Sequence, residues 1–147
     1  MSLSKEDALK LAPVSRQLYA LRNGILADAV RKAGCPCKII FGLNIAQLNA
    51  IATGLDADAE LTRIMWSDRD SREMRLLALC SWPEQMRPAS LDESLELAAG
   101  IQSAEEADML CFRVLKYLPF AAELAYKLEQ TDSQLMRYLS RSLRRHL

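Results

Sequence analysis

The stretch from Asp58 to Pro83 constrains the fold of this chain more than any other feature. Apolar residues recur at helical spacing on each side of a short polar turn at 67–70. Asp70 followed by Glu73 matches a capping box, and Pro83 is expected to end the second helix. A helical hairpin of this length cannot bury its apolar face alone, so it must pack on similar neighbours. The sequence therefore predicts a stack of helix pairs.

Capping patterns recur along the rest of the chain. A capping residue followed three positions later by an acid or amide predicts further helix starts at Ser4, Asn44, Ser90, Ser103 and Thr131. The apolar segment after Pro13 predicts one long helix to about Lys32. Glycines are expected to end three helices, at Gly34, Gly54 and Gly100. The β-branched segment 35–43 is expected to be a loop.

The fold class follows from these boundaries. With no strand-like alternation outside that loop, the chain of 147 residues is predicted to be all-α, a single helical-repeat domain over residues 1–147. Helix pairs recurring about every 35 to 45 residues predict a HEAT/ARM-like α-α superhelix of about four antiparallel helix pairs. A compact bundle without repeats is the alternative.

Charge and composition limit the function classes. Lys+Arg and Asp+Glu both number 19, so any attraction to nucleic acid must come from local charge. No apolar run is long enough to span a membrane and the first residues are polar, so we expect a soluble, cytoplasmic protein with no membrane partner. Its single histidine and four scattered cysteines predict no metal site, no cofactor and no disulfide scaffold. Of these cysteines, Cys80 and Cys111 are expected to be small buried fillers.

Local charge is uneven. Residues 84–110 carry seven acids and one base, whereas the last helix is rich in arginine, with Arg137, Arg141, Arg144 and Arg145. Three of these follow the spacing i, i+4, i+7 and form one stripe. The stripe fits phosphate groups, which arginine binds well, and so predicts contact with duplex DNA. A solvated face that complements the helix C-terminus is the alternative.

Aromatic residues are interpreted as packing. Trp66 and Trp82 are predicted to anchor stacked helices. The aromatic residues of the last two helices are predicted to lie in the core or at helix interfaces, namely Tyr117, Phe120, Tyr126 and Tyr138.

One set of residues in segment 39–83 carries a family resemblance. In order, they are Phe41-Gly42-Leu43, Leu48, Ile51-Ala52, Glu60-Leu61, Met65-Trp66 and the run Arg72-Glu73-x-Arg75-Leu76-Leu77-Ala78. This order resembles a repeat boundary of the DNA alkylation repair family, the HEAT-like helical-repeat DNA glycosylases. In that family, further repeats follow and supply another cleft arginine and tryptophan. The chain is similar to a shortened and divergent member, in which Arg137 or Arg141 is a candidate for that arginine.

The resemblance also implies a catalytic residue. In the family, a central helix carries a tryptophan and, four residues later, an aspartate that stabilises positive charge as the glycosidic bond of an alkylated base breaks. Asp108 matches the aspartate, and Ala104 stands in place of the tryptophan. A pre-positioned carboxylate favours such a transition state, but loss of the aromatic ring removes a stacking surface. An acid that meets the positive end of its own helix is the alternative interpretation of Asp108.

Three functions are therefore expected. The first is a nucleic-acid- or partner-binding module with weakened or lost glycosylase activity. The second is an active DNA glycosylase that excises positively charged alkylated purines with Asp108. The third is a homo-oligomeric protein-interaction scaffold, a homodimer formed through the leucine stripe of the C-terminal helix, Leu135, Leu139, Leu143 and Leu147.

Overall fold

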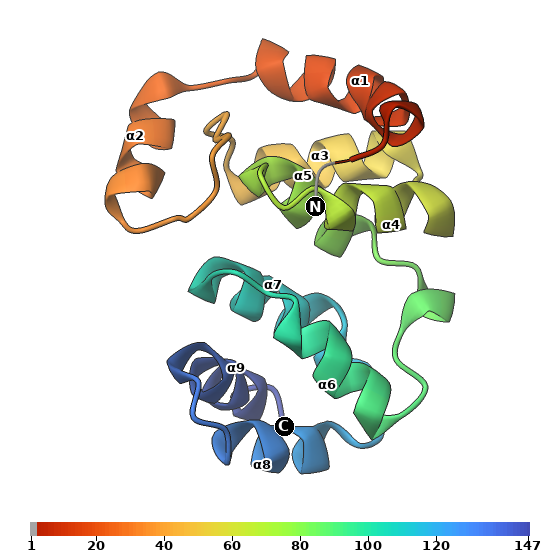
Figure 1. Cartoon of the computed structure of the whole chain (residues 1–147), viewed down its shortest axis with the longest axis vertical. Coiled ribbons are helices and arrows are strands. Elements are labelled where there is room, and N and C mark those ends of the chain that lie inside the picture. Colours follow the sequence, from red (N-terminus) through yellow and green to blue (C-terminus); the bar gives the residue numbers. More distant parts are fainter. Residues whose placement is uncertain (1–2) are drawn as a thin grey trace. The chain divides into compact units, whose positions relative to one another are not determined.

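The regular structure of the chain is helical, as predicted (Figure 1). The computed structural model describes residues 3–147. Within that range the β-type pairing is limited to an isolated parallel bridge between Ile39 and Ser71. None of the described helices is long and apolar enough to cross a membrane. The chain divides after Pro83 into two compact units, which are described separately.

The first unit contains five α-helices among its described residues. They are α1 (Lys5–Ala20), α2 (Gly24–Lys32), α3 (Ile45–Leu55), α4 (Ala59–Ser67) and α5 (Arg72–Ser81). The predicted hairpin is formed by α4 and α5, α3 packs on α5, and α1 packs on α4. Its core includes the fully buried side chains of Leu18, Leu48, Met65 and Leu76.

The second unit contains four α-helices and two short 3₁₀ helices. They are η1 (Glu84–Met86), α6 (Leu91–Ala99), α7 (Ala104–Arg113), η2 (Leu115–Tyr117), α8 (Ala121–Glu129) and α9 (Gln134–Arg144). Here α8 and α9 form a hairpin, α6 packs on α8, and α7 packs on α9. Leu110, Leu124 and Leu139 are fully buried between these helices.

Packing inside each unit agrees with a helical-repeat architecture. In both units a helix packs on the helix two positions later in the chain, as α3 does on α5 and α7 does on α9. Stacked helix pairs produce this neighbour pattern. The number of about four pairs and the extent of a single domain over residues 1–147 remain predictions.

Pro13 does not separate two helices, and this prediction was wrong. α1 continues through the proline to Ala20. A proline inside a helix removes one N–H donor. Three buried residues continue one face of the helix across it, namely Leu11, Val14 and Leu18. Burial of this continuous stripe offsets the missing hydrogen bond.

The helix break lies instead at Asn23. The Asn23 side-chain oxygen accepts hydrogen bonds from the N–H groups of Ile25 and Leu26 at 3.0 and 3.2 Å and so caps α2. The single long helix predicted to Lys32 is therefore two helices. Helical spacing would place Leu21 and Ile25 on the apolar face of such a long helix, but both are exposed, Ile25 to 85%.

Most predicted caps are observed, and three boundaries differ. The Asn44–Gln47 capping box is present, and Ser4, Ser90 and Ser103 cap their helices. α3 continues past Gly54 and ends at Leu55, and its C-cap Asp56 has a left-handed backbone (φ 45°). Ser133 rather than Thr131 caps α9 by accepting from the Met136 N–H. Ser71 rather than Asp70 caps α5 by accepting from the Met74 N–H, and Glu73 binds the loop before α3 instead.

Candidate nucleic-acid interface

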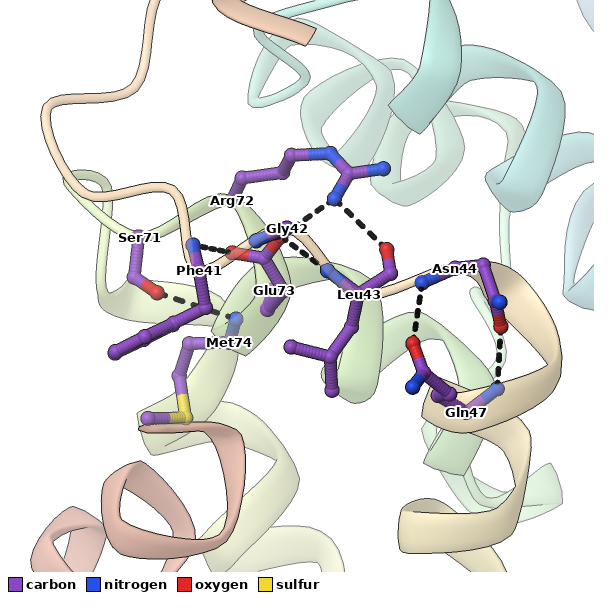
Figure 2. A network of polar contacts seen from close by, with 9 residues as sticks. All are labelled: Phe41, Gly42, Leu43, Asn44, Gln47, Ser71, Arg72, Glu73 and Met74. Carbon is purple, nitrogen blue, oxygen red and sulfur yellow. Dashed lines mark hydrogen bonds and ion pairs between the residues drawn. The ribbon is translucent and has the colours of Figure 1, made fainter. Parts of the chain in front are cut away.

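Residues that carry the family resemblance meet around the buried carboxylate of Glu73 (Figure 2). The Glu73 side chain has 0% exposure. Its two oxygens accept hydrogen bonds from the backbone N–H groups of Phe41, Gly42 and Leu43 at 2.9, 3.0 and 3.4 Å. Arg72 forms an ion pair with the same carboxylate and donates to the Leu43 carbonyl oxygen at 3.1 Å. These contacts fix the loop before α3 to the start of α5, so this motif has a structural role.

Gly42 lies where no side chain fits. Its φ is +87°, and a Cβ atom placed there would be 2.2 Å from the Asn23 carbonyl oxygen and 2.8 Å from the Ala27 nitrogen. Next to it, the Asn23 N–H donates to the Phe41 carbonyl oxygen at 2.9 Å. At Gly42 the loop thus comes too close to the start of α2 for a side chain, and glycine is required for this close approach.

The two tryptophans of the first unit pack against each other. The rings of Trp66 and Trp82 meet edge to face, with centroids 5.8 Å apart and an angle of 89°. The Arg75 guanidinium carbon lies 3.8 Å from the Trp66 centroid, and Arg75 donates to the Trp66 carbonyl oxygen. This arrangement agrees with the prediction that both tryptophans anchor packing.

In the second unit, Asp108 lies exposed on α7, and α9 supplies its partners. The Tyr138 hydroxyl donates to the carboxylate, with distances of 2.8 and 3.0 Å to its two oxygens. The Ser142 hydroxyl donates to Asp108 Oδ1 at 2.7 Å. The two hydroxyls come from successive turns of α9 and fix the orientation of the carboxylate.

Two neighbouring groups are held in their protonated forms. The hydrogen bond to Asp108 raises the pKa of Tyr138 above 10.0, and desolvation adds to this effect. Burial raises the pKa of the Cys111 thiol to about 12. That thiol donates to the Leu139 carbonyl oxygen at 3.6 Å. At neutral pH, Tyr138 is therefore a hydrogen-bond donor and Cys111 is not a nucleophile.

An open hollow of about 530 Å³ lies on the surface formed by α7 and α9. It is lined by Ala104, Gln134, Leu135, Arg137, Tyr138 and Arg141. Tyr138 takes part in both the hollow and the contact with Asp108. Three residues singled out from the sequence, Ala104, Arg137 and Arg141, thus line one hollow, and Asp108 is connected to it through Tyr138.

The four predicted arginines are not equivalent. Arg141, Arg144 and Arg145 are exposed. Arg137 is half-buried and donates to the Thr131 carbonyl oxygen at 2.7 Å, which stabilises the turn between α8 and α9. The exposed basic face therefore consists of Arg141, Arg144 and Arg145, with Arg137 at the edge of the hollow.

The leucine stripe of α9 is not an exposed face, which corrects one expectation. Leu139 and Leu143 have 0% exposure and pack inside the second unit. Leu147, beyond the helix, is exposed. A homodimer cannot use this stripe without unpacking the unit.

Some aromatic residues are more exposed than predicted. Tyr117 and Tyr126 have exposures of 54% and 62%, so neither is a core residue. Phe120 and Tyr138 are half-buried. Helical periodicity alone did not distinguish these positions.

The cysteines form no metal site among the described residues, where no cluster of three or more His, Cys, Asp or Glu side chains could hold an ion. All four are thiols. Cys37 and Cys111 are buried, whereas Cys35 and Cys80 are half-buried, so Cys80 is not the buried filler that was predicted.

Sequence reasoning missed Tyr138 and Ser142 as the partners of Asp108. Their spacing of four residues places both on one face of α9, and this spacing is the available signal. It does not reveal which helix lies opposite.

Compared with protein-family models, curated proteins and solved structures, the chain matches none of them.

Proposed function

We propose that this chain is a nucleic-acid-binding module, related to the DNA alkylation repair helical-repeat proteins, in which glycosylase activity is weakened or lost. It binds duplex DNA through phosphate contacts from α9. One observation carries the proposal: the exposed Arg141 lines the same hollow as Arg137 and Tyr138, and two further exposed arginines, Arg144 and Arg145, follow it at the end of α9.

The charge of α9 supports phosphate binding. The helix carries three arginines and no acidic residue. The helix dipole favours basic residues in the last turn, where Arg141 and Arg144 lie, whereas Arg137 in the first turn donates to the Thr131 carbonyl oxygen. Guanidinium groups suit phosphate oxygens because they donate two parallel hydrogen bonds.

The surroundings of Asp108 favour binding over catalysis. Its carboxylate already accepts hydrogen bonds from Tyr138 and Ser142, which reduce the negative charge available to a developing cation. Ala104 offers no ring on which an extruded base could stack.

The test is binding of a labelled DNA duplex, measured by fluorescence anisotropy across a salt series. Because phosphate contacts release counterions, log affinity should fall with log salt with a slope of about −3 for three or four contacts. Reversing the basic face with Arg141→Glu, Arg144→Glu and Arg145→Glu should lower affinity at least about tenfold.

The matched control reverses three exposed cations of the first unit, Arg16→Glu, Lys38→Glu and Arg63→Glu. It changes the net charge equally, and we expect it to retain most of the binding. Equal loss in both triple variants would mean that total charge, and not α9, determines affinity. Unchanged binding in the α9 variant would refute the proposed surface.

A second candidate function, excision of positively charged alkylated purines, is favoured by one observation. The Asp108 carboxylate is held in a fixed orientation near the hollow, because Tyr138 belongs to both. Such a fixed carboxylate can stabilise a developing oxocarbenium ion. This candidate predicts that the purified protein releases methylated purines from alkylated DNA and that Asp108→Asn abolishes the release at unchanged melting temperature. Absence of release by the wild-type protein would exclude it.

A further inference from the structure

Two aromatic side chains are exposed on consecutive elements, Phe112 near the end of α7 and Tyr117 at the end of η2. Phe112 and Tyr117 have exposures of 49% and 54%. Rings of this size are mostly buried in folded proteins, since burial removes much apolar surface from water. Both rings thus keep apolar surface that a ligand can cover.

Cations surround both rings. The Lys116 ammonium lies 4.0 Å from the Phe112 centroid and 5.2 Å from the Tyr117 centroid, so the rings are neighbours. The Arg87 guanidinium carbon lies 4.3 Å from the Tyr117 centroid. Arg113 is 5.8 Å from the Phe112 centroid. We call Phe112, Tyr117, Arg87, Arg113 and Lys116 the aromatic–cation surface.

This surface continues toward α9. The His146 ring lies with its centroid 6.0 Å from that of Phe112. His146 directly follows Arg144 and Arg145 of the basic face. Glu84 forms an ion pair with Arg87 at 3.7 Å, and the Glu84 side chain is 87% exposed. An ion pair with so exposed a carboxylate is weak and gives way readily to a phosphate.

We propose that the aromatic–cation surface binds unpaired nucleotides, so that the ligand of this module is a nucleic acid with a single-stranded stretch. This inference rests on the proposed nucleic-acid binding and specifies its ligand. Successive bases stack on Phe112 and Tyr117, and the phosphates between them contact Arg87, Arg113 and Lys116. Stacking of this kind tolerates any base, because every base has a π-face.

The composition of the surface favours nucleic acid over a protein partner. Among the described residues of the second unit, the exposed large hydrophobic side chains are Phe112, Tyr117, Tyr126 and Leu147, three aromatic and one aliphatic. Lysine is depleted at the centres of protein interfaces, whereas Lys116 lies against both Phe112 and Tyr117. Here a cation lies against each ring, which is the alternation that single-strand-binding grooves use.

The experiment compares a labelled oligothymidylate of about 12 nucleotides, a length within the range that such sites cover, with a labelled duplex. Both are titrated with the full chain by anisotropy at one salt concentration. The wild-type protein is expected to bind the single strand at least as tightly as the duplex. The double variant Phe112→Ala/Tyr117→Ala should lose at least about tenfold in single-strand affinity and less than about threefold in duplex affinity.

Two controls separate stacking from folding. Phe112→Tyr with Tyr117→Phe keeps both rings and should bind as the wild type does. Tyr126→Ala removes an equally exposed ring outside the surface and should also leave binding unchanged. Melting temperatures of all variants are compared with that of the wild type.

The outcomes distinguish this inference from the function on which it rests. Duplex binding without single-strand binding overturns the inference and leaves the proposed function intact. The inference is also overturned, and the proposed function left intact, if the wild-type protein binds the single strand but the alanine variant binds it with unchanged affinity. Absence of binding to either probe at low salt overturns both. Selective loss of single-strand affinity in the alanine variant, with both controls unchanged, supports the inference.

Discussion

The Glu73 carboxylate is buried, accepts hydrogen bonds from three backbone N–H groups and forms an ion pair with Arg72. The Asp108 carboxylate is exposed and accepts hydrogen bonds from two hydroxyl groups. The capping-box pattern predicted a helix cap for the first, and the family resemblance made the second a candidate for catalysis. A capping box requires only a spacing of three residues, and this spacing also arises when the acid turns toward another segment of the chain.

Glu73→Gln is expected to destabilise the first unit by about 3–5 kcal/mol, because the buried Arg72 loses its counterion. In addition, the new amide NH₂ faces backbone N–H groups where an acceptor is needed. Urea unfolding followed by tryptophan fluorescence measures the change, because Trp66 and Trp82 both lie in this unit.

The matched control is Glu60→Gln. The Glu60 carboxylate is exposed and accepts from Lys10 at 2.7 Å. Exposed ion pairs contribute at most about 1 kcal/mol, so the urea midpoint of Glu60→Gln should differ little from that of the wild type. Equal effects of the two substitutions would contradict a structural role for the buried network.

Tyr138 gives the second unit a pH dependence at alkaline pH. Its pKa is raised above 10.0 by the hydrogen bond to Asp108, so the folded state holds this proton more tightly than the unfolded chain. Between the two pKa values the folded state binds more protons, and stability falls as pH rises above 10.0. Below that pH the full contribution is present.

Asp108→Asn should bring the pKa of Tyr138 back toward its ordinary value, because the charge that favours the neutral phenol is removed. Tyrosinate absorbance during an alkaline titration, with Tyr138→Phe to identify the signal, measures this. If the tyrosine titrates identically with and without the carboxylate, the contact with Asp108 does not form in solution.

At the scale of helices, side-chain capping chemistry located boundaries well because it acts over three residues. Ser90 and Ser103 were identified correctly for this reason. Pro13, Gly54 and Thr131 misled because the local preference of one residue does not determine a helix boundary, and tertiary contacts can override it. In α1, the buried stripe on both sides of Pro13 is such a contact.

Two glycines on neighbouring elements should respond in opposite ways to alanine. Gly42→Ala places a Cβ against the backbone of α2 at positive φ, so it should cost at least about 3 kcal/mol. Gly54 lies inside α3, where an added Cβ meets nothing within 4 Å, so Gly54→Ala should gain up to about 1 kcal/mol. Urea unfolding curves of both variants give the two signs. A neutral Gly42→Ala would show that the loop relaxes away from Asn23.

At the scale of the whole chain, the all-α class followed from the sequence because helix starts and apolar periodicity are local. The candidate site did not, because Asp108 and its partners Tyr138 and Ser142 come from helices separated by about thirty residues and a pairing of this kind has no periodicity of its own. The exposure of Tyr117 likewise depends on what its neighbours cover.

The two compact units allow a last prediction about cooperativity. Each has its own buried core, and both tryptophans belong to the first unit. In a helical-repeat chain, stability is a sum of local terms, so damage to one unit need not reach the other. In Glu73→Gln, the unfolding transition followed by tryptophan fluorescence should therefore move to lower urea concentration. The transition followed by the tyrosinate absorbance of Tyr138, in the second unit, should keep its wild-type urea midpoint. Helicity measured by circular dichroism should then unfold in two steps, because two-state behaviour fails once the midpoints separate. Coincident shifts of all three signals would instead identify residues 1–147 as one cooperative domain.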